Sequence, residues 1–186
     1  MKDRKRPTSF QIALSGISCA AAVIFLSLGI LSRFFVATGY MFGIVALMVP
    51  LSKNFYLGDF LAYIGTCILT LIFGAAAGFW DLVLFIMFFG LHPLANALQK
   101  KFNINKWLAL LVKSVWFDCT LIAAYFLVFG GLIGGSALPE EFYKVINDYI
   151  YLFIFTLGTA FFVLYDFLIF RCQTAVNFIV GKIKKR

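Results

Sequence analysis

The chain has 186 residues, of which 63% are hydrophobic and 19% aromatic, and its mean hydropathy is +0.98. This composition excludes an ordinary soluble domain, which needs a larger polar surface, and indicates a protein surrounded by membrane lipids. The formal net charge of +8 does not indicate a nucleic-acid partner, because the basic residues stand at the ends of apolar runs and not among aromatic residues on one folded face.

Six apolar runs follow one another, and each is expected to form a transmembrane helix. Roughly 20 apolar residues are needed to cross the hydrocarbon core, and a helix satisfies its own backbone groups there. The predicted spans cover residues 10–32, 35–52, 57–77, 79–99, 107–134 and 149–171. The second run is short, and the fifth ends in the glycine-rich stretch GGLIGGSALPEE. The sequence therefore predicts an all-α integral membrane bundle, a single domain over residues 1–186 with basic tails at 1–9 and 172–186.

The basic residues predict the orientation of these helices, because lysine and arginine are enriched in cytoplasmic loops. Of the 16, Lys113 lies inside the fifth run, and Arg33 and Lys144 would face the outside. The remainder would face the cytoplasm: Lys2, Arg4, Lys5, Arg6, Lys53, Lys100, Lys101, Lys106, Arg171, Lys182, Lys184, Lys185 and Arg186. Both termini are thus expected in the cytoplasm of a multi-pass cell-membrane protein, and the first run is expected to stay as an uncleaved helix.

Polar residues at helical spacing predict which face of each helix looks inward, since polar groups in a span normally face protein or water. The predicted inward stripes are Asp59, Tyr63, Thr66 and Thr70; Asp81, Phe85, Phe88, His92, Asn96 and Gln99; Ser114, Asp118, Leu121 and Tyr125; and Thr156, Thr159, Val163 and Asp166.

Four polar residues, Asp59, His92, Lys113 and Asp166, lie at similar depths from the cytoplasmic ends and are expected to share one buried layer. Lys113 would pair with Asp59 or Asp166. Such a pair either fixes how the helices pack or forms part of a proton or ion relay. His92, which precedes Pro93, is expected to be a hydrogen-bonded packing residue, with a ligand role as the alternative.

Two further aspartates lie deeper or on the outer side. Asp118 is near the middle of the fifth run, and Asp81 follows Trp80 at the outer end of the fourth. Either carboxylate suits a cationic group of a ligand entering from outside. Asp81 has an alternative role as a helix cap, because a carboxylate in the first turn satisfies free backbone donors.

Small residues form a stripe along the first helix, comprising Ser9, Ala13, Gly16, Ala20 and Ser27. Stripes of this kind let another helix approach closely. The partner is either another helix of the chain or another subunit.

Sequence motifs for catalysis are absent: there is no GxxxxGK[ST], HExxH or GxSxG pattern, and the chain has one histidine. The cysteines Cys19, Cys67, Cys119 and Cys172 lack the spacing of a zinc site and are interpreted as small apolar fillers. We therefore expect no enzyme activity, no cofactor and no metal.

Six short helices, cytoplasmic termini, a basic N-terminus and the small-residue stripe together resemble the S-components, the substrate-binding membrane subunits of energy-coupling factor transporters. The stretches YMFGIVALMVPLSKNFY, FFGLHPLANALQKK and LVKSVWFD also resemble a pattern in uncharacterised small membrane proteins of Gram-positive bacteria.

The resemblance to S-components implies capture of a vitamin-like micronutrient and docking on a membrane coupling subunit driven by ATPases. Docking would use Ser9, Ala13, Gly16 and Ala20, whose spacing departs from a regular AxxxA repeat. The solute would lie in the outer half, near Trp80, Asp81, Asp118, Tyr125 and Tyr149. Two other functions fit the same sequence: a non-transporting scaffold or assembly protein of the cell envelope, and a small ion- or proton-coupled transporter.

Overall fold

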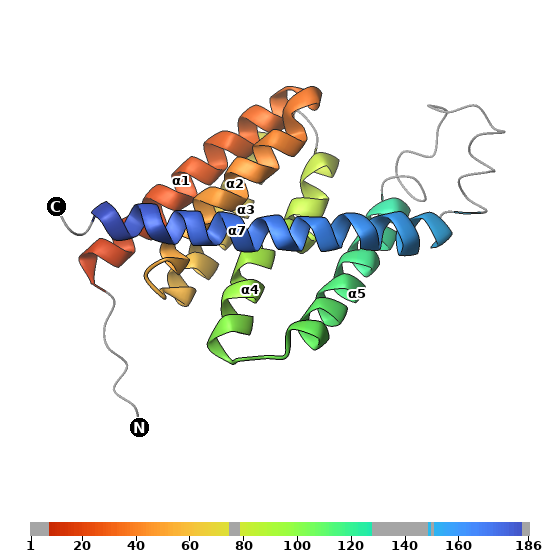
Figure 1. The fold of residues 1–186 in the computed structure, drawn as a ribbon. Coiled ribbons are helices and arrows are strands. Elements are labelled where there is room, and N and C mark those ends of the chain that lie inside the picture. The colour runs from red at the N-terminus through yellow and green to blue at the C-terminus, as the bar shows by residue number, and fades with distance from the viewer. Residues whose placement is uncertain (1–7, 75–78, 128–148, 150, 184–186) are drawn as a thin grey trace. The chain divides into compact units, whose positions relative to one another are not determined.

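The computed structural model describes residues 8–74, 79–127, 149 and 151–183, and every regular element in these residues is a helix (Figure 1). Within these described residues, four helical stretches are long and apolar enough to cross a membrane: Ser9–Leu31, Tyr56–Phe73, Lys106–Tyr125 and Tyr151–Lys182. The predicted all-α class is confirmed, and the apolar helices fit a protein embedded in a membrane. The predicted loop GGLIGGSALPEE and the ends of the third and fifth predicted spans lie outside the described residues.

The chain forms two compact units. One contains Met1–Phe102 and Ile169–Arg186 and is called the α1–α4 unit; the other contains Asn103–Leu168 and is called the α5 unit. Helix α7 (Thr159–Ile183) contributes its first residues to the α5 unit and its later residues to the α1–α4 unit.

Helices α1 (Ser9–Leu31) and α2 (Val36–Leu51) pack together through glycine. Thr8 begins α1, because its hydroxyl accepts from the backbone N–H of Gln11 while the Gln11 side chain accepts from the Thr8 N–H. Near the other end, Gly29 and Gly39 bring the two backbones into contact: a Cβ built on Gly39 would lie 2.7 Å from the Phe25 carbonyl oxygen. The close approach on α1 therefore occurs at Gly29, outside the predicted small-residue stripe.

Helix α2 has 16 residues and so spans only about 24 Å at 1.5 Å per residue. Pro50 lies in its last turn, and Asn54 in the following turn has a positive φ of 54°, a conformation that asparagine tolerates. Helix α3 (Tyr56–Gly74) begins directly after this turn. As predicted for the second run, α2 is short for a full span.

The fourth predicted span, residues 79–99, was wrong as one continuous helix. The structure divides it into a 3₁₀ turn (Phe79–Leu82), a π-helical turn (Phe85–Phe89) and helix α4 (His92–Lys101). Pro93 is the physical reason, because it has no backbone N–H to continue the preceding helix and is well placed in the first turn of a new one. Gly90 at the junction packs on Tyr63, whose ring would lie 2.6 Å from a Cβ there.

The inward faces predicted for the third and fourth runs are confirmed by burial. Asp59, Tyr63, Thr66 and Thr70 are all buried on α3. So are Phe85, Phe88, His92, Asn96 and Gln99 in the segment that ends with α4, whereas Asp81 is half-buried. Tyr63 joins the two stripes by donating a hydrogen bond of 2.6 Å to the Ile86 carbonyl oxygen.

The last helical stretch differs from the sixth predicted span in two respects. It continues to Ile183, so the basic tail expected from residue 172 is helical for most of its length. Its predicted inward stripe is also wrong at Thr156 and Val163, which are exposed. Thr156 needs no inward partner, because its hydroxyl donates to the Leu152 carbonyl oxygen one turn earlier at 2.6 Å.

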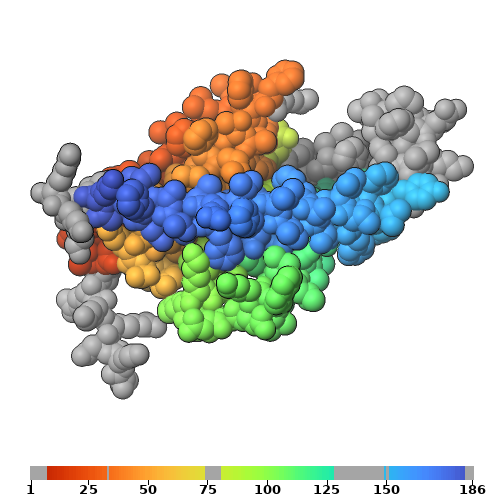
Figure 2. Space-filling view, viewed as in Figure 1, coloured from red at the N-terminus to blue at the C-terminus, as the bar shows by residue number. Residues whose placement is uncertain are grey.

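The buried face of this stretch is mainly apolar and aromatic, comprising Ile154, Phe162, Tyr165, Asp166, Ile169, Gln173, Val176 and Val180. Its opposite face carries large exposed apolar side chains, among them Phe161, Leu164, Phe167 and Phe178. The side chains of α7 form a continuous ridge in the space-filling view (Figure 2). An exposed apolar face of this length suits contact with lipid acyl chains.

Candidate functional site

The α5 unit contains a polar seam, defined here as the facing side chains of α5 (Lys106–Tyr125) and the α7 stretch that begins with the π-helical turn Ile154–Gly158. Lys113 contacts Asp166, Phe117 contacts Phe162, and Asp118 contacts Thr159. Residue numbers rise on one helix as they fall on the other, so the two helices run antiparallel. The seam is the candidate functional site.

At one end of the seam, Lys113 and Asp166 form a buried ion pair. The Lys113 Nζ lies 2.6 Å from Asp166 Oδ1, and each side chain keeps only 7% of its exposure. Of the two partners predicted for Lys113, the structure therefore selects Asp166. A pair of opposite charges compensates for the loss of hydration that either group alone would suffer in an apolar interior.

The middle of the seam is aromatic. The rings of Phe117 and Phe162 are stacked with centroids 5.5 Å apart, and both side chains are buried. The Phe161 ring also stacks on Phe117, with centroids 6.2 Å apart, and on Tyr165, with centroids 6.4 Å apart. These rings separate the ion pair from the next polar contact and keep the surroundings of both apolar.

At the other end of the seam, only one of the two carboxylate oxygens of Asp118 receives a hydrogen bond from the residues that the structure describes. Its Oδ2 accepts a hydrogen bond of 3.1 Å from the Thr159 hydroxyl, while its Oδ1 is buried and receives no hydrogen bond from the residues that the structure describes. Gly158 faces Oδ1: a Cβ built there would lie 3.5 Å from this oxygen. Gly158 thus lies in contact range of Oδ1 but offers it no side-chain donor.

The π-helical turn at Ile154–Gly158 lies beside this carboxylate. Such turns interrupt the regular hydrogen bonding of an α-helix and often occur at functional sites. A buried carboxylate with one oxygen that receives a hydrogen bond and one that receives none has capacity for a further hydrogen bond from a cationic or N–H/O–H group. It is also the kind of group that a proton- or cation-coupled transporter places within a membrane.

The other predicted members of the buried polar layer lie in the α1–α4 unit. Asp59 and His92 are both buried, as expected. The His92 ring packs on Phe88 with centroids 5.1 Å apart, which agrees with a packing role. Their membership of one layer with Lys113 and Asp166 stays a prediction, because these residues belong to the other unit.

The predicted solute residues besides Asp118 fall into both units. Tyr125 lies two turns after Asp118 on α5, and Tyr149 is exposed. Asp81 lies within the short 3₁₀ segment Phe79–Leu82, in its first turn, which is the position that the predicted capping role requires. The Asp81 carbonyl oxygen accepts a hydrogen bond from the Tyr40 hydroxyl. The side chain of Trp80 lies outside the described residues.

The predicted docking stripe is open. Ser9, Ala13, Gly16 and Ala20 are all exposed on α1, and a Cβ built on Gly16 would meet no atom within 4 Å. The stripe is therefore not the surface on which α1 packs against α2. Large apolar side chains, including Ile12, Ile17 and Ile24, flank it and are exposed as well.

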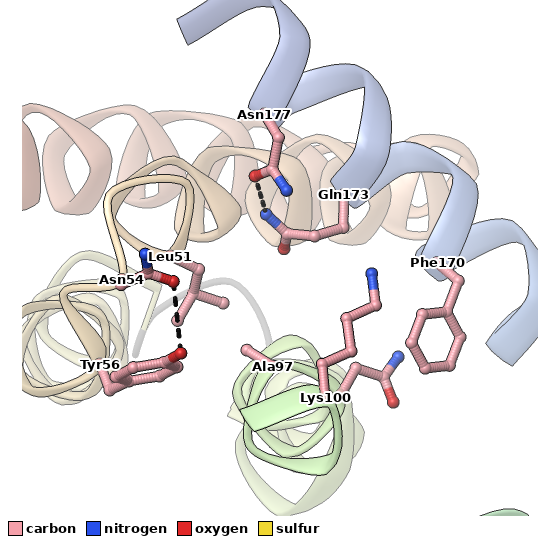
Figure 3. A pocket seen from close by; sticks show the side chains of 9 residues that line it. Leu51, Asn54, Tyr56, Ala97, Lys100, Phe170, Gln173 and Asn177 are labelled. Carbon is pink, nitrogen blue, oxygen red and sulfur yellow. Dashed lines mark hydrogen bonds between the residues drawn. The ribbon is translucent and has the colours of Figure 1, made fainter. Parts of the chain in front are cut away.

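Sequence reasoning missed a pocket in the α1–α4 unit, which has a volume of about 90 Å³ (Figure 3). Polar side chains from three regions meet there: Asn54 and Tyr56 at the α2–α3 turn, Asn96 and Lys100 on α4, and Gln173 and Asn177 on α7. The available signals were the i, i+4 spacing of Asn96 with Lys100 and of Gln173 with Asn177. Because the sequence predicts a tail from residue 172 onward, it does not assign the second pair to a site.

No metal site is formed by the described residues, which contain no group of three or more histidine, cysteine, aspartate or glutamate side chains in suitable positions. All four cysteines are free thiols; Cys119 is exposed and the others are half-buried. Cys119 therefore differs from the buried filler expected from the sequence, since it lies on the outer face of α5.

No protein-family model, curated protein or solved structure matches this chain. The function is therefore inferred from the chemistry of its own side chains.

Proposed function

We propose that this chain is the solute-binding membrane subunit of an importer for a vitamin-like micronutrient, with both termini in the cytoplasm and with Asp118 as the residue that contacts the solute. The observation that carries the proposal is the half-satisfied Asp118 carboxylate. Thr159 orients it through Oδ2, and Oδ1 stays available to a donor on the solute. Ionisable groups within membrane helices are costly and are retained mainly where they serve a function.

The exposed stripe on α1 supports the second half of the proposal, docking on a coupling subunit. A helix face made of small residues allows another helix to approach until the backbones touch. Within the α1–α4 unit this kind of contact is made by Gly29 and Gly39, so Ala13, Gly16 and Ala20 remain available to a partner. The partner would be a membrane protein that is itself driven by ATPases.

The direct test is purification in mild detergent from native membranes, followed by identification of co-purifying proteins and of any small molecule released on denaturation. A coupling subunit with ATPases, together with a vitamin-sized compound, is the expected result. Envelope-synthesis proteins without a bound compound would contradict the importer and favour a scaffold.

Replacing Asp118 with asparagine is expected to reduce the amount of compound that co-purifies by about tenfold or more. The reason is that a hydrogen bond to a charged group contributes about 1.5–3 kcal/mol, and asparagine removes the charge while it keeps the size and the contact with Thr159. The measurement is mass spectrometry of the released compound per mole of protein. Cys119→Ser, one residue away on the exposed face, is the control and should retain the compound.

Replacing Ala20 with leucine is expected to remove the coupling subunit from the purified complex without changing the amount of bound compound. The added side chain stands on the open stripe and prevents close approach of a second helix. Ala175→Leu makes the same substitution on the exposed face of α7 and should leave the complex intact. Equal loss of the partner in both variants would contradict a docking role of the stripe.

A second candidate function is transport of a proton or small cation, and the seam itself favours it. Asp118 and the Lys113–Asp166 pair lie on the same pair of helices with the Phe117–Phe162 stack between them. Protein in liposomes would then dissipate an imposed proton or sodium gradient, and Asp118→Asn would abolish this activity. Full activity of that variant would rule out the relay.

A further inference from the structure

The pocket in the α1–α4 unit has a buried acceptor that its surroundings leave unsatisfied. Gln173 is 7% exposed, and its amide nitrogen donates to the Met48 carbonyl oxygen at 3.3 Å and to Asn177 Oδ1 at 3.0 Å. Both N–H groups are thereby used, which fixes the orientation of the amide. The Gln173 Oε1 is buried, receives no hydrogen bond from any described residue, and points into the pocket (Figure 3).

The pocket also has a cation. The Lys100 side chain extends from α4 towards α7, and its Nζ lies 5.0 Å from the centre of the Phe170 ring (Figure 3). No carboxylate is among the lining residues. The pocket thus offers an ammonium group to an anion, while Asn54 and Asn177 supply further amide N–H groups at its edge.

The size of the pocket limits what can fill it. One water needs roughly 10–15 Å³ of such space, so the volume of about 90 Å³ corresponds to roughly six to nine waters. A phosphate group with a neighbouring hydroxyl group is of this size. A vitamin, which needs a pocket of several hundred Å³, is not.

We propose that this pocket binds the glycerophosphate group, with its phosphate on Lys100 and a glycerol hydroxyl donating to Gln173 Oε1. The hydroxyl supplies a hydrogen-bond donor for the Gln173 Oε1. The phosphate supplies a negative charge opposite the Lys100 ammonium group. A phosphoethanolamine group would also offer a donor, but its own ammonium group cancels the phosphate charge. The net positive pocket therefore selects the anionic ester.

Glycerophosphate occurs both as the headgroup of phosphatidylglycerol and as a free metabolite. Basic pockets between membrane helices commonly hold anionic lipid headgroups. Lys53 and Lys101 add positive charge near the pocket: Lys53 donates to the Val180 carbonyl oxygen at 3.3 Å, and Lys101 lies 4.4 Å from the Tyr56 ring centre. This inference does not depend on the importer proposal, because none of the pocket residues belongs to the Asp118 seam.

The full chain is reconstituted in phosphatidylcholine nanodiscs that contain one test lipid and is then purified. Native mass spectrometry measures how much of the test lipid the protein retains. Phosphatidylglycerol is expected to be retained about tenfold more than phosphatidylethanolamine, because its headgroup carries a net negative charge. It should also be retained more than phosphatidylmethanol, which has the same charge but no hydroxyl group. In parallel, glycerol 3-phosphate is titrated by calorimetry. Binding of the soluble compound with no lipid preference would assign the pocket to the free metabolite. Binding of neither would overturn the proposal.

Two variants separate the contribution of the phosphate charge to lipid retention from that of the glycerol hydroxyl group. Lys100→Met should reduce retention of phosphatidylglycerol and phosphatidylmethanol alike by about tenfold. The control Lys182→Met, whose ammonium group lies over the Phe178 ring and does not line the pocket, should change retention less than twofold. Gln173→Met should remove the preference for phosphatidylglycerol over phosphatidylmethanol while both still bind. Thermal unfolding of each variant establishes that it is folded, and an unchanged preference in folded Gln173→Met would overturn the assignment of the hydroxyl.

Discussion

Lys113→Met is expected to lower the free energy of unfolding by about 3–5 kcal/mol, the range typical of breaking a buried ion pair. The substitution leaves Asp166 charged and buried without the ammonium group that lies 2.6 Å from it. Unfolding in mixed dodecylmaltoside and SDS micelles, followed by tryptophan fluorescence, measures the loss. Lys106→Met, at the exposed start of the same helix, is the control and should change stability by less than about 0.5 kcal/mol.

The double variant Lys113→Met/Asp166→Leu decides between the two roles considered for this pair. Because both charges are then replaced by apolar groups, stability should return to within about 1 kcal/mol of the parent protein. If the pair serves packing alone, the double variant also keeps its bound compound and its partners. A stable double variant that has lost transport would instead establish a relay, and a double variant no more stable than Lys113→Met would show that the loss does not come from an uncompensated charge.

Gly39→Ala is expected to destabilise the protein by about 1–3 kcal/mol, the usual cost of overpacking. Its new methyl group would lie 2.7 Å from the Phe25 carbonyl oxygen and 2.9 Å from the Gly29 Cα. Both neighbours are backbone atoms, so relief requires α1 and α2 to move apart. The same unfolding assay measures the effect.

Gly16→Ala is the matched control for this prediction. It lies within a helix in the same unit, and its Cβ would meet nothing within 4 Å. Alanine has the higher helix propensity by about 1 kcal/mol, so this variant should be as stable as the parent or slightly more stable. Equal destabilisation by both substitutions would contradict the glycine contact between α1 and α2.

The spacing of polar and aromatic residues was sufficient to predict the buried face of α3 and of the segment that ends in α4. The spacing of Asp59, Tyr63, Thr66 and Thr70 predicted the buried face of α3 because all four lie on one side of a regular helix. The same reasoning failed at Thr156, since a threonine hydroxyl can bond to its own helix and then needs no inward partner. A threonine that bonds to its own helix can therefore lie on either face: Thr66 donates to the Ala62 carbonyl oxygen in the same way and is buried.

The candidate site shows a similar division. The sequence identified Lys113, Asp118 and Asp166 individually because charged residues are rare within apolar runs. It left two partners open for Lys113, and it gave no means to see that Asp118 would bond to Thr159 and face Gly158. Those contacts depend on the antiparallel register of two helices, which side-chain packing sets over the whole seam.

The sequence by itself determined that this is a helical protein suited to a membrane, because hydropathy and charge act residue by residue and need no knowledge of neighbours. It also determined the inward faces of α3 and of the segment ending in α4, where regular spacing suffices. Only the tertiary structure decided that Lys113 pairs with Asp166, that Asp118 bonds to Thr159, and that Lys100 and Gln173 line one pocket. Each of these depends on contacts between residues that are distant in the sequence or on competition between hydrogen-bonding partners, and neither quantity is a property of a local window.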